Sequence, residues 1–151
     1  MTAKEYLRQY EYAVDRVRRY EEEYENESLL IDAIRSASDN DGMPHGSGIS
    51  KPTEEMALRL ADKRMRLVDA KLEAIRIRQE IFDTIMMVGG LEADVLLERF
   101  VYLKDWMSIC RELNYSWYPI RIAWHKGEEI LQNILDEREG HTTTYNENGL
   151  E

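Results

Sequence analysis

The chain has 151 residues, with 20 basic and 30 acidic side chains and therefore a net charge of −10. Hydrophobic residues make up 43% of it, which is enough for a folded core, and the acidic balance argues against a general nucleic-acid coat protein but not against one local basic contact surface. The single cysteine, Cys110, excludes a disulfide scaffold and indicates a reducing compartment. The sequence shows neither a membrane-length apolar run nor a signal-peptide pattern, so we expect a cytoplasmic protein without a membrane partner.

The first predicted element is a helix from residue 3 to about residue 36, a stretch without glycine or proline. Its hydrophobic residues follow one another in alternating steps of four and three, which is the heptad pattern of a packed helical seam. Only Glu27 interrupts that pattern. The seam consists of Tyr6, Tyr10, Ala13, Val17, Tyr20, Tyr24, Ile31 and Ile34.

The next segment, residues 37–52, is rich in turn-forming residues and predicts a connecting loop. A second helix is expected from an N-cap at Thr53 to Val88. Its hydrophobic seam repeats every seven residues at Leu60, Leu67, Ala74, Ile81 and Val88. Ala70 and Ile77 fill the intermediate positions of the repeat, and Lys63 and Thr84 weaken it. We expect an antiparallel helical hairpin over residues 1–90.

The hairpin seam is rich in tyrosine and alanine, which suggests that a second molecule completes it. We therefore expect a homodimer or a higher oligomer through the seam from Leu60 to Val88. Replacing Leu67 or Ile81 by glutamate should then weaken self-association.

The C-terminal third has a different layout, with shorter helices that follow a stop at Gly89 and Gly90. Helices are expected over residues 91–102 and 105–113. Asn114 tolerates the left-handed conformation that a tight turn requires, and Ser116 is a good N-cap for a third helix to about residue 137. Residues 139–151 are polar and aperiodic, as in a flexible tail.

This order of helix, turn and helix predicts an all-α protein that ends in a helix-turn-helix over residues 91–138. The characteristic positions of such a unit are filled at the expected spacing, with Cys110 as the small residue where the helices cross. The other residues in these positions are Ile109, Leu113, Asn114, Tyr115, Ile120 and Ala123.

The segment LLERFVYLKDWMSICRELNYS resembles the region-four DNA-binding module of sigma factors. Together with the opening MTAKEYLRQY and the loop GMPHGSG, it makes nearly the whole chain similar to small phage and prophage proteins of Gram-positive bacteria. These are relatives of the ArpU and RinA late-gene transcription regulators. The resemblance implies a role in phage gene expression within the cytoplasm of a bacterial host.

If the third helix enters a major groove of double-stranded DNA, its exposed N-terminal half faces the bases. Arg121 is the most plausible base reader, because a guanidinium bonds guanine bidentately. The base-facing candidates are Ser116, Trp117, Tyr118, Arg121, Ile122 and His125. The residues expected to bind phosphate are Lys104, Arg111 and Lys126.

Two alternatives come from other functional classes. The third helix begins SWYPIRIAWHK, which is aromatic and nearly uncharged apart from Arg121 and Lys126. That composition also suits a protein that binds a host protein, such as RNA polymerase or an immunity effector, without contacting DNA. A small-terminase-like packaging factor would likewise combine a helix-turn-helix with an oligomerising coil.

An enzyme is not expected. His45, His125 and His141 are scattered, and the sequence has no zinc-protease motif, cysteine pair or glycine-rich phosphate loop. His125 has the helical spacing to share a metal with Glu128 and Glu129, but so small a cluster does not predict a site. We expect no metal and no cofactor.

Overall fold

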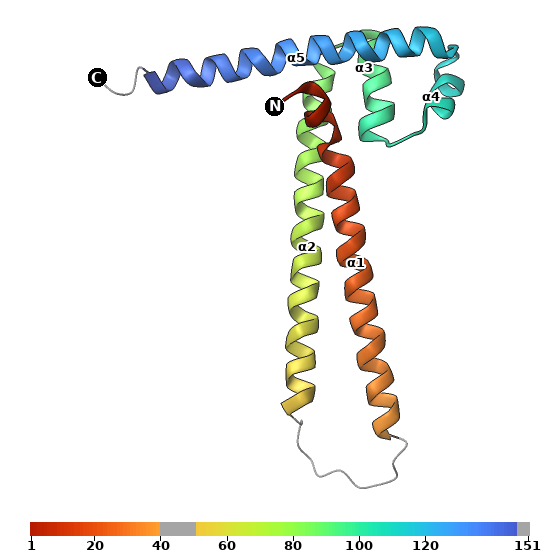
Figure 1. Ribbon diagram of the computed structural model, residues 1–151, viewed down its shortest axis with the longest axis vertical. Helices are drawn as coiled ribbons and strands as arrows, with labels where there is room; N and C mark the ends of the chain where they lie inside the picture. Colours follow the sequence, from red (N-terminus) through yellow and green to blue (C-terminus); the bar gives the residue numbers. More distant parts are fainter. Residues whose placement is uncertain (40–50, 148–151) are drawn as a thin grey trace. The chain divides into compact units, whose positions relative to one another are not determined.

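A computed structural model describes the backbone of residues 1–39 and 51–147, with side chains for residues 1–37 and 53–141. The described residues form helices and no strand, so the all-α prediction is confirmed (Figure 1). In chain order the elements are α1 (Ala3–Asp39), α2 (Lys51–Met86), α3 (Gly90–Leu96), the π-helical turn η1 (Leu97–Val101), α4 (Trp106–Leu113) and α5 (Trp117–Glu147).

The helix boundaries differ from the sequence prediction at several points. Helix α2 ends at Met86 rather than Val88, the predicted N-cap Thr53 lies inside it, and the helix predicted over residues 91–102 is divided into α3 and η1. Helix α1 continues to Asp39 and α2 begins at Lys51, so helix occupies both edges of the loop predicted over residues 37–52. The rest of that loop, residues 40–50, lies outside the described residues. Helix α5 passes its predicted end near residue 137 and reaches Glu147, so residues 139–147 of the predicted flexible tail are helical, with Gly140 inside the helix.

The chain divides into two compact units, and the division falls within α1 and α2 rather than at residue 90. The hairpin unit is Ala13–Ile75. The terminal unit combines Met1–Tyr12 with Arg76–Glu151 and so includes the predicted helix-turn-helix.

In the hairpin unit, α1 and α2 pack through their predicted seams, which bury mainly small and aliphatic residues. The buried seam residues are Ala13, Ile31, Leu67, Ala70 and Ala74. Ile34 departs from the prediction, since 40% of its surface is exposed.

The interruption at Glu27 has a partner on the other helix. Lys63, which weakened the α2 seam, places its ammonium 3.1 Å from Glu27 and 2.7 Å from Glu23. Arg59 approaches the second oxygen of Glu27 at 3.6 Å. The Glu27 side chain is only 11% exposed, so the seam holds an almost buried carboxylate that is stabilised by cations from α2.

These contacts shift the protonation equilibria in a definite direction. Hydrogen bonds to Glu23 and then Glu27 raise the pKa of Lys63 above its ordinary value of 10.5. The same contact lowers the pKa of Glu23 below 4.5. The stabilisation from Glu23 is therefore complete above pH 4.5 and is lost as the pH falls through its lowered pKa.

In the terminal unit, the first turns of α1 and the end of α2 pack against α3, η1 and α5. The buried core consists of Ala3, Tyr6, Leu7, Ile81, Ile85, Ala93, Leu96, Leu97, Phe100, Val101, Leu131 and Leu135. Ile81 has no exposed surface and Leu67, in the hairpin unit, is 8% exposed. The chain therefore fills its own seam, and these two residues offer no surface to a second molecule.

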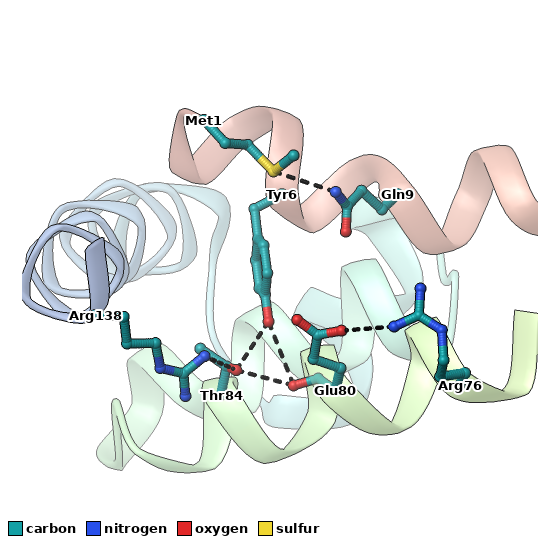
Figure 2. A network of polar contacts seen from close by, with 7 residues as sticks. All are labelled: Met1, Tyr6, Gln9, Arg76, Glu80, Thr84 and Arg138. Atoms are coloured by element: carbon teal, nitrogen blue, oxygen red, sulfur yellow. Dashed lines mark hydrogen bonds and ion pairs between the residues drawn. The ribbon is translucent and has the colours of Figure 1, made fainter. Parts of the chain in front are cut away.

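Thr84, the other weak position of the α2 seam, is 1% exposed and joins three helices (Figure 2). Its hydroxyl donates to the Glu80 carbonyl at 2.9 Å and accepts from the Arg138 guanidinium of α5 at 3.0 Å. The Tyr6 hydroxyl of α1 lies 2.8 Å away. The same Tyr6 hydroxyl also lies 3.4 Å from the Glu80 carbonyl, so both hydroxyls are grouped around that acceptor.

The start of α1 is fixed by polar contacts as well. Thr2 and Glu5 form a reciprocal capping box, because the Thr2 amide donates to the Glu5 carboxylate and the Thr2 hydroxyl accepts from the Glu5 amide. The Ala3 amide donates to the Gln132 side chain of α5 at 2.7 Å. The backbone amides of Thr2, Ala3 and Glu5 therefore all have hydrogen-bond acceptors at the start of α1.

Between α2 and α3, Gly89 and Gly90 both adopt positive φ, at 72° and 65°. Residues with a side chain rarely adopt this backbone conformation, so the two glycines allow the chain to leave α2 and turn into α3. Gly127 of α5 serves packing instead: a Cβ there would lie 3.0 Å from Leu96, so the missing side chain lets α5 approach α3 closely.

We expect Thr84→Val to lower the free energy of unfolding by about 1–3 kcal/mol, because it removes the 2.8 Å partner of the buried Tyr6 hydroxyl and one acceptor of the Arg138 guanidinium. Thr84→Ser is the matched control, since it keeps the hydroxyl and loses one methyl group, worth roughly 0.8 kcal/mol. Urea unfolding followed by circular dichroism measures both. A Thr84→Val protein as stable as the wild type would show that the hydroxyl is dispensable.

For the hairpin unit, Glu27→Leu and Lys63→Leu should each lower the melting temperature, because each leaves a nearly buried charge with fewer partners. The double variant Glu27→Leu/Lys63→Leu should recover most of that loss, since it converts both positions into ordinary seam residues. Calorimetry on the three variants checks this. If the two losses simply add, the residues do not act as a pair.

Candidate functional site

The C-terminal module is built around a small core shared by α3, α4 and α5. Val95, Ile109 and Ile120 have no exposed surface and Ala123 is 4% exposed, so each of the three helices contributes to it. The prediction that Ile109, Ile120 and Ala123 lock a helix-turn-helix agrees with this packing. Cys110, the expected crossing residue, lies partly buried at the edge of the same core.

The turn between α4 and α5 follows the sequence closely. Asn114 adopts the left-handed conformation, with φ 58° and ψ 40°, and its amide donates to the Cys110 carbonyl. The Tyr115 amide donates to the same carbonyl at 3.1 Å. Helix α5 then begins at Trp117, so Ser116 occupies the position directly before it, as predicted.

The start of α4 is capped by Asp105. Its carboxylate accepts from the Ser108 amide at 2.8 Å and from the Ser108 hydroxyl at 3.2 Å. The bond from the amide is the main reason that the pKa of Asp105 lies below 3.8. Between η1 and this cap, Leu103 has a positive φ of 55°, and the Arg99 guanidinium donates to the Lys104 carbonyl at 2.9 Å. The link before α4 is thus held by specific bonds.

The three tryptophans gather beside this link. The Trp106 ring lies 5.3 Å from Trp117 and 4.7 Å from Trp124, measured between ring centroids. Trp124 packs against the core and donates to Glu128 at 2.7 Å, so its side chain has a packing role. Trp117 is 44% exposed and is the most accessible of the three.

All six predicted base-facing residues are exposed, and they lie at or near the N-terminal end of α5. Tyr118 is 72% exposed and Ile122 is 49% exposed. Arg121 and Ile122 follow Tyr118 by three and four residues and precede His125 by four and three, so the four residues share one face of the helix. The His125 ring also stacks on Trp124, with 4.5 Å between centroids.

The three residues predicted to bind phosphate differ in their exposure and in the carboxylates near them. Lys104 places its ammonium against the carboxylates of Glu112 and Glu98, whose hydrogen bonds raise the pKa of the lysine above 10.5, and this engagement leaves it poorly placed for phosphate. Lys126 lies 3.5 Å from Glu92 but remains 63% exposed. Arg111 is exposed, and its charge acts on the nearby carboxylates of Asp105 and Glu112.

The sequence analysis missed an apolar groove beside this face. It has a volume of about 550 Å³ and is lined by Trp106, Met107, Cys110, Arg111 and Trp117. Met107 is 77% exposed, more than its hydrophobic character favours. Helical spacing alone predicts that Met107 is exposed, because it places this residue on the side of α4 away from Ile109 and Leu113.

No cluster of three histidine, cysteine, aspartate or glutamate side chains with metal-binding geometry occurs among the described residues. None of the described helices combines the length and apolar character that crossing a membrane requires. Comparison of the chain with protein-family models, curated proteins and solved structures finds no match.

The left-handed turn generates a stability prediction. Asn114→Ala should lower the free energy of unfolding by about 1 kcal/mol, because a Cβ without a compensating polar group disfavours this conformation. Asn114→Gly removes the Cβ and should retain the wild-type value within a few tenths of a kcal/mol. Equal losses in both variants, measured by urea unfolding, would contradict the backbone explanation.

Proposed function

We propose that this protein is a DNA-binding transcription regulator whose helix α5 enters the major groove. The observation that carries the proposal is the exposed face of α5 that begins directly after the left-handed turn at Asn114. In helix-turn-helix proteins, the N-terminal residues of the second helix reach the base edges. The resemblance to sigma region four and to small phage regulators of the ArpU and RinA type supports the same proposal.

Within this proposal, Arg121 reads a base and Lys126 contacts the phosphate backbone. Arg111 is the second phosphate contact. Lys104 instead holds the module together through Glu98 and Glu112. With so few phosphate contacts the electrostatic part of the affinity is small, so recognition depends on specific contacts to bases.

The groove supports a second candidate function, a docking site for a host protein such as RNA polymerase. Its lining is apolar and aromatic, and Tyr115 and Tyr118 are exposed close by in the sequence. Aromatic side chains dominate the energy of protein interfaces, whereas they contribute less to base recognition in a groove. A regulator that binds both DNA and a protein would use α5 for the first and the groove for the second.

The two functions predict opposite mutant profiles. For DNA binding, Arg121→Ala should cost about 1–3 kcal/mol on a selected site, while Lys126→Ala should weaken all sequences alike and reduce the salt dependence by about one phosphate contact. For protein docking, Trp117→Ala and Tyr118→Ala should dominate, and neither basic substitution should matter.

The experiment is a selection from random duplex DNA with the wild-type protein at low salt, followed by affinity measurements on these four variants. Circular dichroism of each variant controls for folding. If no sequence is enriched and no DNA is retarded at low salt, the DNA proposal is wrong and the docking function takes its place.

A further inference from the structure

Helix α2 carries a second hydrophobic stripe that its own chain leaves uncovered. Five large apolar residues of the hairpin unit are between 41% and 70% exposed: Leu58, Met65, Val68, Leu72 and Ile75. With Ala61, they follow one another in alternating steps of three and four. This is the heptad spacing of a helix that packs against a straight neighbour.

The stripe is separate from the seam against α1. The α1-facing seam uses Leu60, Leu67 and Ala74, whereas the second stripe uses Leu58, Met65 and Leu72, two positions earlier in each heptad. Leu67 and Ala74 are 8% and 7% exposed, but Met65 and Leu72 are both 60% exposed. One helix thus has two parallel seams, of which the chain fills only one.

The described side chains of helix α1 form no matching second stripe. Its exposed hydrophobic residues in the hairpin unit, Leu29, Leu30 and Ile34, lie together in one short segment rather than at heptad intervals. The uncovered stripe is therefore a property of α2 alone. A helix with the same repeat is the surface that would fit it best, and α2 of a second copy has that repeat.

We infer that two copies of this chain associate through the outer stripes of their α2 helices, side by side and parallel. Position by position, Leu58, Met65 and Leu72 form one set of core layers and Ala61, Val68 and Ile75 the other. Because each α2 is already folded against α1, association does not have to bear the cost of helix nucleation. This inference does not depend on DNA binding.

The flanking charges select the parallel orientation. In a parallel pair Arg64 of one copy faces Asp69 of the other, and symmetry gives this attraction twice. Neither residue forms an ion pair within the described part of its own chain. In an antiparallel pair Arg64 would instead face Lys71, and Asp62 would face Asp69, so like charges would meet on both flanks.

The other charged residues that flank the parallel pair, Lys71 and Arg76, are neutralised by carboxylates of their own chain. Lys71 would face Arg76 of the other copy, which brings together two positive charges. Lys71 already lies 4.0 Å from Glu21, and Arg76 lies 3.2 Å from Glu80. The Arg64–Asp69 contacts therefore decide the orientation.

Sedimentation equilibrium of the full chain at concentrations up to about 100 µM tests the inference. We expect a dimer, and we expect Leu72→Glu to raise its dissociation constant at least about tenfold. The matched control is Leu29→Glu, the same substitution at a leucine of α1 that is 67% exposed, and it should dimerise as the wild type does. Both variants should keep the wild-type circular dichroism spectrum, since neither side chain is buried in the monomer.

A charge exchange tests the orientation. Arg64→Glu should weaken the dimer, and Arg64→Glu/Asp69→Arg should restore it, because the exchange rebuilds the attraction in the parallel pair. A monomeric wild type, or a Leu72→Glu protein that dimerises normally, overturns the interface. A dimer strengthened by Arg64→Glu overturns the parallel arrangement, because only an antiparallel pair relieves repulsion in that way.

Discussion

The fold depends on polar groups placed inside hydrophobic seams and matched across the helices. Glu27 meets Lys63 in the hairpin unit, and Tyr6 meets Thr84 in the terminal unit. Glu27 follows Tyr6 by three heptads, and Lys63 precedes Thr84 by three heptads, so both pairs specify the same antiparallel register. A seam of tyrosine and alanine alone tolerates slippage by one heptad, whereas a shifted seam would bury these polar groups without partners.

Most of the helical framework was predictable because its periodicity is local. The heptad seams, the turn at Asn114 and the position of Ser116 before α5 all depend on residues close together in the sequence. The seam exceptions at Glu27, Lys63 and Thr84 were visible too, but their pairing was not. Which residue of α1 lies opposite which residue of α2 is set by long-range packing, and one sequence does not contain that information directly.

At the candidate site, too, local features could be predicted from the sequence, whereas contacts between separate elements could not. Exposure of Tyr118, Arg121 and Ile122 follows from helical spacing and was predicted, while the engagement of Lys104 depends on Glu98 and Glu112, which lie on two other elements. The α1-facing seam was expected to serve self-association. It is filled by the chain itself, because α1 and α2 match each other in length and repeat, and the surface left uncovered is a different stripe of α2.

The placement of the aromatic residues has a consequence for spectroscopy. All three tryptophans of the chain belong to the C-terminal module, where Trp106 contacts both of the others, and the hairpin unit contains tyrosine but no tryptophan. Tryptophan fluorescence therefore reports on the module alone, while far-ultraviolet circular dichroism is dominated by the long helices. If the two units unfold separately, the circular dichroism change has a component that tryptophan fluorescence does not follow, and that component reports the hairpin unit without any introduced label.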